Sequence, residues 1–320
     1  MTQAAVTAQL HRHPHGITAV DTEYLHPGHA ASHVIADAGR AAFVDVGTNF
    51  SVAYLLAALE ELSIPRAAVD YILLTHVHLD HAGGAGLLLQ SLPNARVFVH
   101  PRGAAHMVDP AKLIAGSKVV YGEERFARLY GELVPLPHER LHPVADGERI
   151  ALGGRTLELI HTPGHALHHY AVVDAAHHSI FPGDTFGVSY RALDTANGAF
   201  VTPATTPTQF DPGQLIASVD RMLAYAPESM YLMHFSRVTD VPRLGASMKT
   251  QVAALADIAR AHARDADPAP GIKADMLALW LRLAREHGIT SSEAQIIQVL
   301  GGDLELNTQG LVVWLKREQR

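Results

Sequence analysis

The amino-acid sequence predicts a layered domain of the α/β or α+β class, followed by a group of helices. Across the first two hundred residues, strand-like runs alternate with helix-like segments. Many of the strands form pairs joined by tight turns, which is typical of hairpin-built sheets flanked by helices rather than of a doubly wound parallel sheet. From about residue 244 the hydrophobic periodicity is helical throughout. We therefore expect one large domain over residues 1–243 and a helical C-terminal appendage over residues 244–320.

The first series of elements begins with a hairpin. Residues 32–47 read as two apolar runs around a turn at Ala38-Gly39. A helical pattern over 51–64 leads into a buried, β-branched and aromatic strand over 69–75. The remaining predicted elements of this series are a short helix over 83–92, a strand over 96–100 and a helix over 117–133.

A second series repeats this order, as two similar halves would. Residues 148–162 read as strand, Gly-Gly turn and strand, and residues 170–185 read as another hairpin. The segment 191–213 is irregular and rich in Thr and Pro, and loops of this length are usually functional or disordered. A helix over 213–226 and a short strand over 230–234 follow.

The C-terminal part shows four helical patterns separated by turn-like segments. They cover residues 246–264, 272–286, 291–299 and 307–318. Ser292 and Asn307 offer N-cap side chains for the last two helices. We interpret four apolar positions in these helices as packing residues rather than cofactor contacts: Leu277, Trp280, Leu281 and Trp314.

The composition narrows the classes of function. The chain carries 25 basic and 32 acidic residues, a formal charge of −7, without a block of Lys and Arg, so we expect no nucleic-acid partner. The absence of cysteine excludes disulfides and thiolate ligands. The 22 histidines suit metal binding or proton transfer. No apolar stretch has the length of a signal peptide or a membrane span, so we expect a cytoplasmic protein without a membrane partner.

The stretch "LLTHVHLDHAGGAG", residues 73–86, places metal-competent side chains where an apolar strand ends. Residues two apart on an extended chain face the same side, so His76 and His78 can address one ion. Asp80 and His81 follow where the chain turns, and they address a neighbouring position. A complete H-x-H-x-D-H pattern is far more specific than an H-x-H pair alone. It predicts a metal site held by histidine and carboxylate.

Three further strands end in a side chain that can bind a metal. The fragment "HTPGH" brings His165 after a Pro-Gly turn, and "FPGDT" does the same for Asp184. The fragment "LMHF" ends an apolar run on His234. The carboxyl ends of strands are where separate segments of a chain can converge, so these fragments are candidates for the same site as residues 76–81.

In this order, the motifs "THVHLDH", "TPGH" and "PGDT" and a late strand-end histidine resemble those of the metallo-β-lactamase superfamily of binuclear metal hydrolases. The resemblance covers roughly residues 17–240 and is greatest to the branch that contains glyoxalase II and the lactonases. It implies a four-layer αββα sandwich, with two sheets face to face and helices outside, and leaves the helical C-terminal residues as an appendage.

The resemblance also implies two divalent metal ions and a set of ligands. His76, His78 and His165 would bind the first metal, Asp80, His81 and His234 would bind the second, and Asp184 would bridge both. Nitrogen and oxygen donors without sulfur suit zinc, which we favour, and also iron or manganese.

Two residues outside this ligand set are candidates for supporting roles. Asp45, in "FVDVG", has two interpretations: a residue that orients a ligating imidazole, or an ordinary turn residue at a strand end. His169, one turn beyond His165, is a candidate for a similar supporting contact.

The implied activity is a metal-dependent hydrolysis. Two adjacent cations lower the pKa of a bridging water, and the resulting hydroxide attacks a small ester, thioester or lactone whose oxygen the metals polarise. Asp80 and Asp184 are the candidate catalytic residues, with Asp80 orienting the hydroxide through its second oxygen.

Some subfamilies fit the sequence less well. True β-lactamases often place a cysteine on the second metal, and this chain has none. Acyl-homoserine lactonases usually have a tyrosine at the position of Gly187, although Tyr190 is close in the sequence. Flavin-linked di-iron proteins usually carry glutamate at the position of His78. Two alternatives stay open: an iron-dependent redox protein, resembling persulfide dioxygenases or oxygen- and NO-handling members, and a metal-bearing sensor or binding protein.

The expected partner is a small-molecule substrate. We expect residues 186–213 and 101–135 to form the pocket walls, and their mixture of aromatic and small apolar residues suits a partly apolar, weakly charged molecule. The C-terminal helices could cap the site or form a homodimer.

Overall fold

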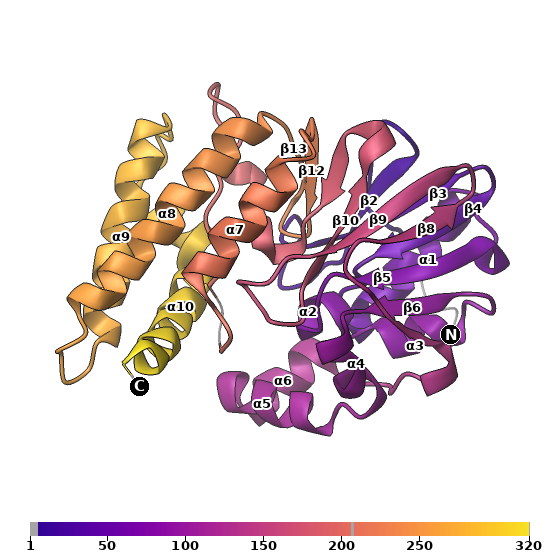
Figure 1. Cartoon of the computed structure of the whole chain (residues 1–320), viewed down its shortest axis with the longest axis horizontal. Helices are drawn as coiled ribbons and strands as arrows, with labels where there is room; N and C mark the ends of the chain where they lie inside the picture. The colour runs from indigo at the N-terminus through magenta and orange to yellow at the C-terminus, as the bar shows by residue number, and fades with distance from the viewer. Residues whose placement is uncertain (1–5, 206–207, 320) are drawn as a thin grey trace.

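The computed structural model describes residues 6–205 and 208–319, and in it two β-sheets pack face to face between layers of helices (Figure 1). Helices α1 (Val52–Glu61) and α3 (Ala85–Gln90) cover the outer face of the first sheet. Helices α7 (Pro212–Leu223) and α8 (Val241–Ala261) cover the outer face of the second. The predicted αββα sandwich is therefore confirmed.

The first sheet contains seven strands in chain order, antiparallel from β1 to β4 and parallel from β4 to β7. The predicted turn at Ala38-Gly39 joins β3 and β4. Because β4, β5 and β6 run parallel, their carboxyl ends lie at the same edge of the sheet. The strands are β1 (Leu10–Arg12), β2 (Ile17–Asp21), β3 (Ala31–Asp37), β4 (Arg40–Val44), β5 (Val69–Leu74), β6 (Arg96–Val99) and β7 (Leu141–Pro143).

The second sheet contains six strands in the order β13-β12-β11-β10-β9-β8. Neighbouring strands are antiparallel except for β11 and β12, which run parallel. The parallel pairing brings the carboxyl ends of β11 and β12 together. The strands are β8 (Glu148–Leu152), β9 (Arg155–His161), β10 (Tyr170–Asp174), β11 (Ser179–Phe181), β12 (Ser229–Leu232) and β13 (Ser236–Val238).

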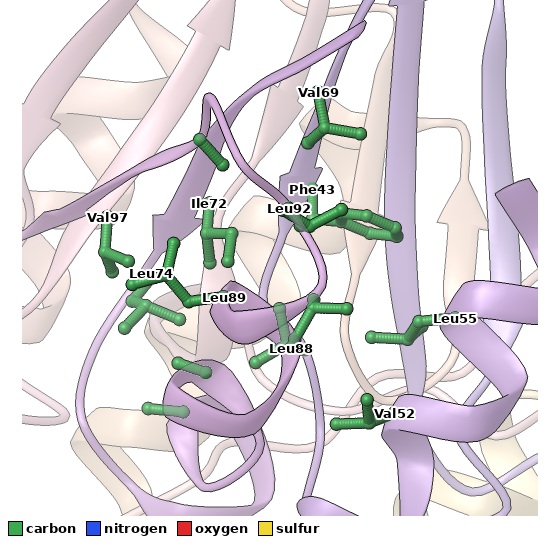
Figure 2. Packing of buried hydrophobic residues seen from close by; sticks show 14 of the residues in the cluster. Phe43, Val52, Leu55, Val69, Ile72, Leu74, Leu88, Leu89, Leu92 and Val97 are labelled. Atoms are coloured by element: carbon green, nitrogen blue, oxygen red, sulfur yellow. The ribbon is translucent and has the colours of Figure 1, made fainter. Parts of the chain in front are cut away.

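The sandwich is held together by apolar clusters on both faces of each sheet. Figure 2 shows the cluster outside the first sheet, where Phe43 and Ile72 meet Leu55 of α1 and Leu88 of α3. A second cluster lies between the sheets, and a third lies between the second sheet and α7 and α8. Complete burial of one such side chain stabilises the fold by about 1.5–3 kcal/mol, so these layers contribute much of the stability of the sandwich.

The segment after β6 contains shorter helices than the sequence suggested. The helix expected over 117–133 is two helices, because Gly122 separates them with a left-handed φ of 78°. Gly116 and Ser117, expected at the helix start, lie inside the first of the two. The helices between β5 and β7 that have not yet been given are α2 (Leu79–Ala82), α4 (Pro101–Val108), α5 (Ala111–Tyr121) and α6 (Glu123–Tyr130).

The C-terminal helices α8, α9 (Ala269–Glu286) and α10 (Glu293–Glu318) gather on one side of the molecule (Figure 1). Their apolar side chains share a core with side chains of residues 188–215. The packing interpretation is confirmed for Trp280 and Trp314, which are buried, and Leu277 and Leu281 pack half-buried against the same core. The proposed domain boundary at residue 243 falls within α8 and stays a prediction.

One helix occupies the place of the last two helices predicted from the sequence. The sequence "GGD" at 301–303 does not interrupt α10, because both glycines keep helical backbone angles and the helix is packed on both sides of them. Ser292 caps α10 as predicted, since its hydroxyl accepts from the amide of Gln295. Asn307 is not a cap: it lies in the middle of α10 and is buried.

Within the described residues, no helix combines the length and the apolar character needed to cross a membrane.

The buried imidazole of His33 makes a testable contribution to acid stability. It lies on β3 against Phe181 and Tyr231, and its Nε2 has no hydrogen-bond partner. Burial, with a smaller effect of His13, lowers the pKa of His33 to about 3. Below pH 6.5 the unfolded chain gains a proton on this imidazole that the folded chain does not. The free energy of unfolding therefore decreases as the pH is lowered from about 6.5 to about 3. At pH 5 the loss is about 2 kcal/mol.

We expect the His33→Phe variant to lose less stability than the parent protein between pH 7 and pH 5. Urea unfolding at both pH values measures the difference. Equal losses in the two proteins would contradict the burial of a neutral imidazole at this position.

Candidate metal centre

The seven predicted ligands follow the carboxyl ends of four strands and meet at one edge of the sandwich. His76 and His78 follow β5, and Asp80 and His81 lie in the single turn of α2. The other three follow β9, β11 and β12. Their ligand atoms form three groups, within each of which all atoms lie within 4.8 Å: His76, His78 and His165; His76, His81 and Asp184; Asp80, His81 and His234.

In the first group, three imidazole nitrogens face one another. His78 Nδ1 lies 2.8 Å from His76 Nε2 and 3.0 Å from His165 Nε2. His165 donates its Nδ1 proton to the carbonyl oxygen of Ala204 over 2.9 Å, so its Nε2 carries a lone pair. The Nδ1 of His76 lies 3.2 Å from the hydroxyl of Thr75. Because this hydroxyl donates its own proton to Asp45 over 2.8 Å, it can accept the Nδ1 proton of His76, which leaves the lone pair on Nε2. Lone pairs that converge at these distances suit a shared cation.

Asp184, a member of the second group, connects the first group with the third. Its Oδ2 lies 3.6 Å from His165 Nε2, and its Oδ1 lies 3.2 Å from His81 Nε2 and 4.0 Å from His234 Nε2. In the third group, His234 Nε2 lies 3.4 Å from Asp80 Oδ2. His234 donates its Nδ1 proton to the carbonyl oxygen of His29 over 3.0 Å, which again turns a lone pair toward the carboxylates.

Two atoms at the junction of the groups test whether the residues fit a metal. His81 Nε2 and Asp184 Oδ1 are buried and have no hydrogen-bond partner in proper geometry. Buried polar atoms are normally paired, and an unpaired one requires an explanation such as an ion. The donor set of five imidazoles and two carboxylates without sulfur is one that divalent transition metals accept. The cluster is therefore compatible with a divalent metal site.

Asp45 supports His81, which the second and third groups share, from the side away from the other ligand atoms. Its carboxylate accepts from the Thr75 amide over 2.8 Å, from the Thr75 hydroxyl over 2.8 Å and from His81 Nδ1 over 2.8 Å. Its backbone adopts a left-handed φ of 53°, a conformation that is uncommon for residues other than glycine but that aspartate tolerates better than most. The contact with a histidine of the cluster is the one expected if Asp45 orients an imidazole, whereas a simple turn residue would not need it.

The electrostatics of the cluster favour cation binding. Burial alone would raise the pKa of Asp184, but the nearby charges of His81, His234 and His165 hold this pKa well below its usual range. Burial opposes protonation of His81, yet the attraction of Asp184, Asp45 and Asp80 raises its pKa well above the usual value. Three carboxylates in one buried site thus retain a demand for positive charge.

Comparison with known families supports this arrangement. A family model described as "Metallo-beta-lactamase superfamily" matches residues 25–234. The chain belongs to this superfamily. The matched residues include all seven side chains of the cluster.

The chain aligns with different shares of the length of two relatives in the superfamily. The metallo-beta-lactamase fold-containing protein ST1585 of Sulfurisphaera tokodaii is 30% identical over 224 residues, which are 69% of this chain and 77% of that protein. A hydroxyacylglutathione hydrolase of Aeromonas hydrophila is 30% identical over 178 residues, 55% of this chain. The chain spans about half, 52%, of the length of that hydrolase.

Solved structures show the same fold. The crystal structure of ST1585 from Sulfolobus tokodaii superposes with a TM-score of 0.65 at 24% identity, covering 92% of this chain and 98% of that one. The chemotaxis sensor ODP of T. denticola, solved with a peroxy diiron species, has a TM-score of 0.53 at 14% identity and covers 76% of this chain and 94% of the sensor. The fold is therefore also found in a sensor that was solved with a diiron species.

A cavity of about 280 Å³ opens beside the cluster of this superfamily member. Its walls come from residues on α4 and α5, from Tyr130 and from Leu306 of α10, which lies far away in the sequence. Asp80 and Asp184 are the only carboxylate residues among its lining residues. The lining residues are His78, Leu79, Asp80, His106, Lys112, Leu113, Gly116, Ser117, Val120, Tyr121, Tyr130, His168, Asp184, Thr208, Gln209 and Leu306. A larger hollow, lined by Asp37, Arg155 and others, lies at the opposite ends of the strands and contacts none of the seven.

Three further residues near the cluster, His168, His169 and Tyr190, agree to different degrees with the predictions from the sequence. His169 is buried, and its Nδ1 lies 2.8 Å from the Thr162 hydroxyl, so it braces the strand end instead of joining the three ligand groups. Tyr190 does not line the cavity, and its hydroxyl donates to Asp303 of α10. His168, by contrast, lines the cavity although it belongs to none of the sequence motifs. The only signal for it was its place beside His169 after the "TPGH" motif.

Proposed function

We propose that this protein is a binuclear metal-dependent hydrolase that acts on a small ester, thioester or lactone. The observation that carries the proposal is that Asp184 joins the group of His76, His78 and His165 to the group of Asp80, His81 and His234, with an open cavity beside them. The superfamily consists generally of metal-dependent hydrolases, and the similarity to a hydroxyacylglutathione hydrolase supports a carbonyl substrate.

In the proposed ligand assignment, the first and third groups each hold one metal, and Asp184 of the second group lies between them. His76, His78 and His165 hold the first metal, Asp80, His81 and His234 hold the second, and Asp184 binds both. Zinc is the proposed metal, with iron or manganese as the alternatives that this donor set also accepts. A bound pair of divalent cations supplies Lewis acidity and makes a hydroxide nucleophile available near neutral pH.

The chain's own residues then bind and orient the reactants. Asp80 lines the cavity, and although burial opposes ionisation, His81 and His234 hold its pKa below the usual range, so its carboxylate stays ionised. It can accept a hydrogen bond from the attacking water and fix its direction. Leu79, Leu113 and Val120 exclude water from the apolar part of a substrate, and Lys112 and Gln209 offer polar contacts.

A substrate panel tests the proposal. Protein loaded with zinc, manganese or iron is assayed with p-nitrophenyl esters, lactones, thioesters and phosphodiesters. We expect hydrolysis of at least one ester, thioester or lactone, with loss of activity after chelation and recovery after metal addition. The Asp80→Asn variant, which keeps the shape of the side chain, should lose most of this turnover. Absence of hydrolysis by every metal form, together with oxygen uptake or sulfur oxidation by the iron form, would support the redox alternative instead.

A further inference from the structure

We propose that Asn307, in the middle of α10, positions His165 through the segment 203–205, so that the C-terminal helices are part of the metal centre. This inference rests on the proposed role of His165 as a metal ligand. Figure 1 shows α10 in the helical group apart from the sheets, whereas His165 follows β9. The link between them is a short chain of hydrogen bonds through the segment 203–205.

The first part of the link is the contact of Asn307 with both neighbours of Ala204. Its Oδ1 accepts from the amide of Thr205 over 2.6 Å, and its Nδ2 donates to the carbonyl oxygen of Pro203 over 2.8 Å. The hydroxyl of Thr205 lies 3.1 Å from both Oδ1 and the backbone oxygen of Asn307. Asn307 is 1% exposed, so water does not compete for these bonds.

The second part of the link is the contact between Ala204 and the cluster. The carbonyl oxygen of Ala204 accepts the Nδ1 proton of His165. This bond selects the tautomer in which Nε2 of His165 faces His78 and Asp184. Partners of this kind set the ring orientation and basicity of a metal-binding imidazole. Asn307 therefore acts on His165 by fixing the peptide on each side of its acceptor.

Ala204 packs in the C-terminal apolar core, but within the described residues the backbone hydrogen bonds of 203–205 are made only with Asn307 and His165. Around Ala204, an isolated β-bridge between Val188 and Thr202 is the nearest sheet pairing within the described residues. Buried backbone groups of an irregular segment must find partners elsewhere, and the side chain of Asn307 supplies two of them. Asparagine is also a poor residue for a helix interior, so a buried one in α10 indicates a tertiary requirement.

The test compares full-length Asn307→Leu and Asn307→Asp with the parent protein. Leucine has a similar size but neither donor nor acceptor, whereas aspartate keeps the acceptor for Thr205 and loses the donor to Pro203. The matched control is Thr308→Val on the same helix, because among the described residues the buried Thr308 hydroxyl bonds only to the carbonyl of Leu304. Chelator competition with zinc gives the two dissociation constants, and nitrogen-15 NMR of histidine-labelled apoprotein reports the tautomer of His165.

We expect Asn307→Leu to weaken one zinc site about 10–100-fold while the other changes less than about threefold. The Nδ1-protonated tautomer of His165 should become a mixture in the apoprotein, and Asn307→Asp should lie between Asn307→Leu and the parent. Thr308→Val should keep both constants and the tautomer.

Two outcomes would overturn the inference. The first is an unchanged tautomer and unchanged zinc affinity in Asn307→Leu. The second is equal weakening of both sites in proportion to a lower melting temperature, which Thr308→Val would then share. If the parent protein bound no zinc, the proposed function would fail, while the apoprotein tautomer would still decide whether Asn307 positions His165.

Discussion

The Asp184→Ala variant is expected to lose metal binding at both proposed sites and to lose measurable hydrolysis. Oδ2 of Asp184 faces His165 of the proposed first site, and Oδ1 faces His81 of the proposed second site. Changes in residues that merely orient metal ligands cost about 10–100-fold in affinity, so removal of a shared ligand should cost more than about 100-fold. Metal analysis after gel filtration and zinc competition with a chelator measure the loss.

The control for this variant is Asp257→Ala. Asp257 is exposed on α8 and pairs only with Arg260 in the part of the chain that the structure describes, so its loss should leave metal content and turnover unchanged. Circular dichroism should show equal helix content for both variants, because the apolar layers do not depend on Asp184. Full metal content together with parental turnover in Asp184→Ala would show that this carboxylate binds no metal.

The Asp45→Asn variant is expected to weaken zinc binding about 10–100-fold, although Asp45 is not a proposed ligand. The carboxylate accepts hydrogen bonds from the amide and hydroxyl of Thr75 and from His81 Nδ1. An amide of the same shape has one acceptor oxygen, and its NH₂ group would face a donor. The imidazole of His81 must then either move or shift its proton to Nε2, which blocks the lone pair that faces Asp184.

The pattern of loss separates this effect from simple destabilisation. The weakened site should be the one that contains His81, and turnover at saturating zinc should recover at least in part, because the ligands themselves remain. Activity and the two zinc dissociation constants, measured for Asp45→Asn and for Asp45→Ala, test this. If the asparagine variant bound both zinc ions as tightly as the parent, Asp45 would be an ordinary turn residue that does not orient His81.

The sequence allowed the fold class and the convergence of the seven side chains to be predicted for a physical reason. Each candidate ligand follows an apolar strand, and the parallel neighbours β11 and β12 end at the same edge of the second sheet, so Asp184 and His234 had to come close together. The residues after β5 join them because the two sheets pack face to face, an arrangement that the resemblance implied. Alternation along an extended chain was sufficient to place His76 beside His78. The superfamily match then agreed with motifs of high specificity.

Other features depend on tertiary contacts that periodicity does not encode. A single left-handed residue, Gly122, divides α5 from α6, and no apolar pattern marks such a break. The glycines at 301 and 302 stay helical because Leu300, Leu304 and Leu311 pack into the C-terminal core. The role of Asn307 was misread as a cap for the same reason: its partners lie about one hundred residues earlier in the chain.

The metal content of the intact protein tests the central claim most directly. Crystals of protein loaded with zinc, measured above and below the zinc absorption edge, should show two anomalous peaks. One should lie among His76, His78 and His165, the other among Asp80, His81 and His234, with Asp184 in contact with both. No peak at this edge of the sandwich, or zinc bound by other residues while these seven stay apart, would contradict the account.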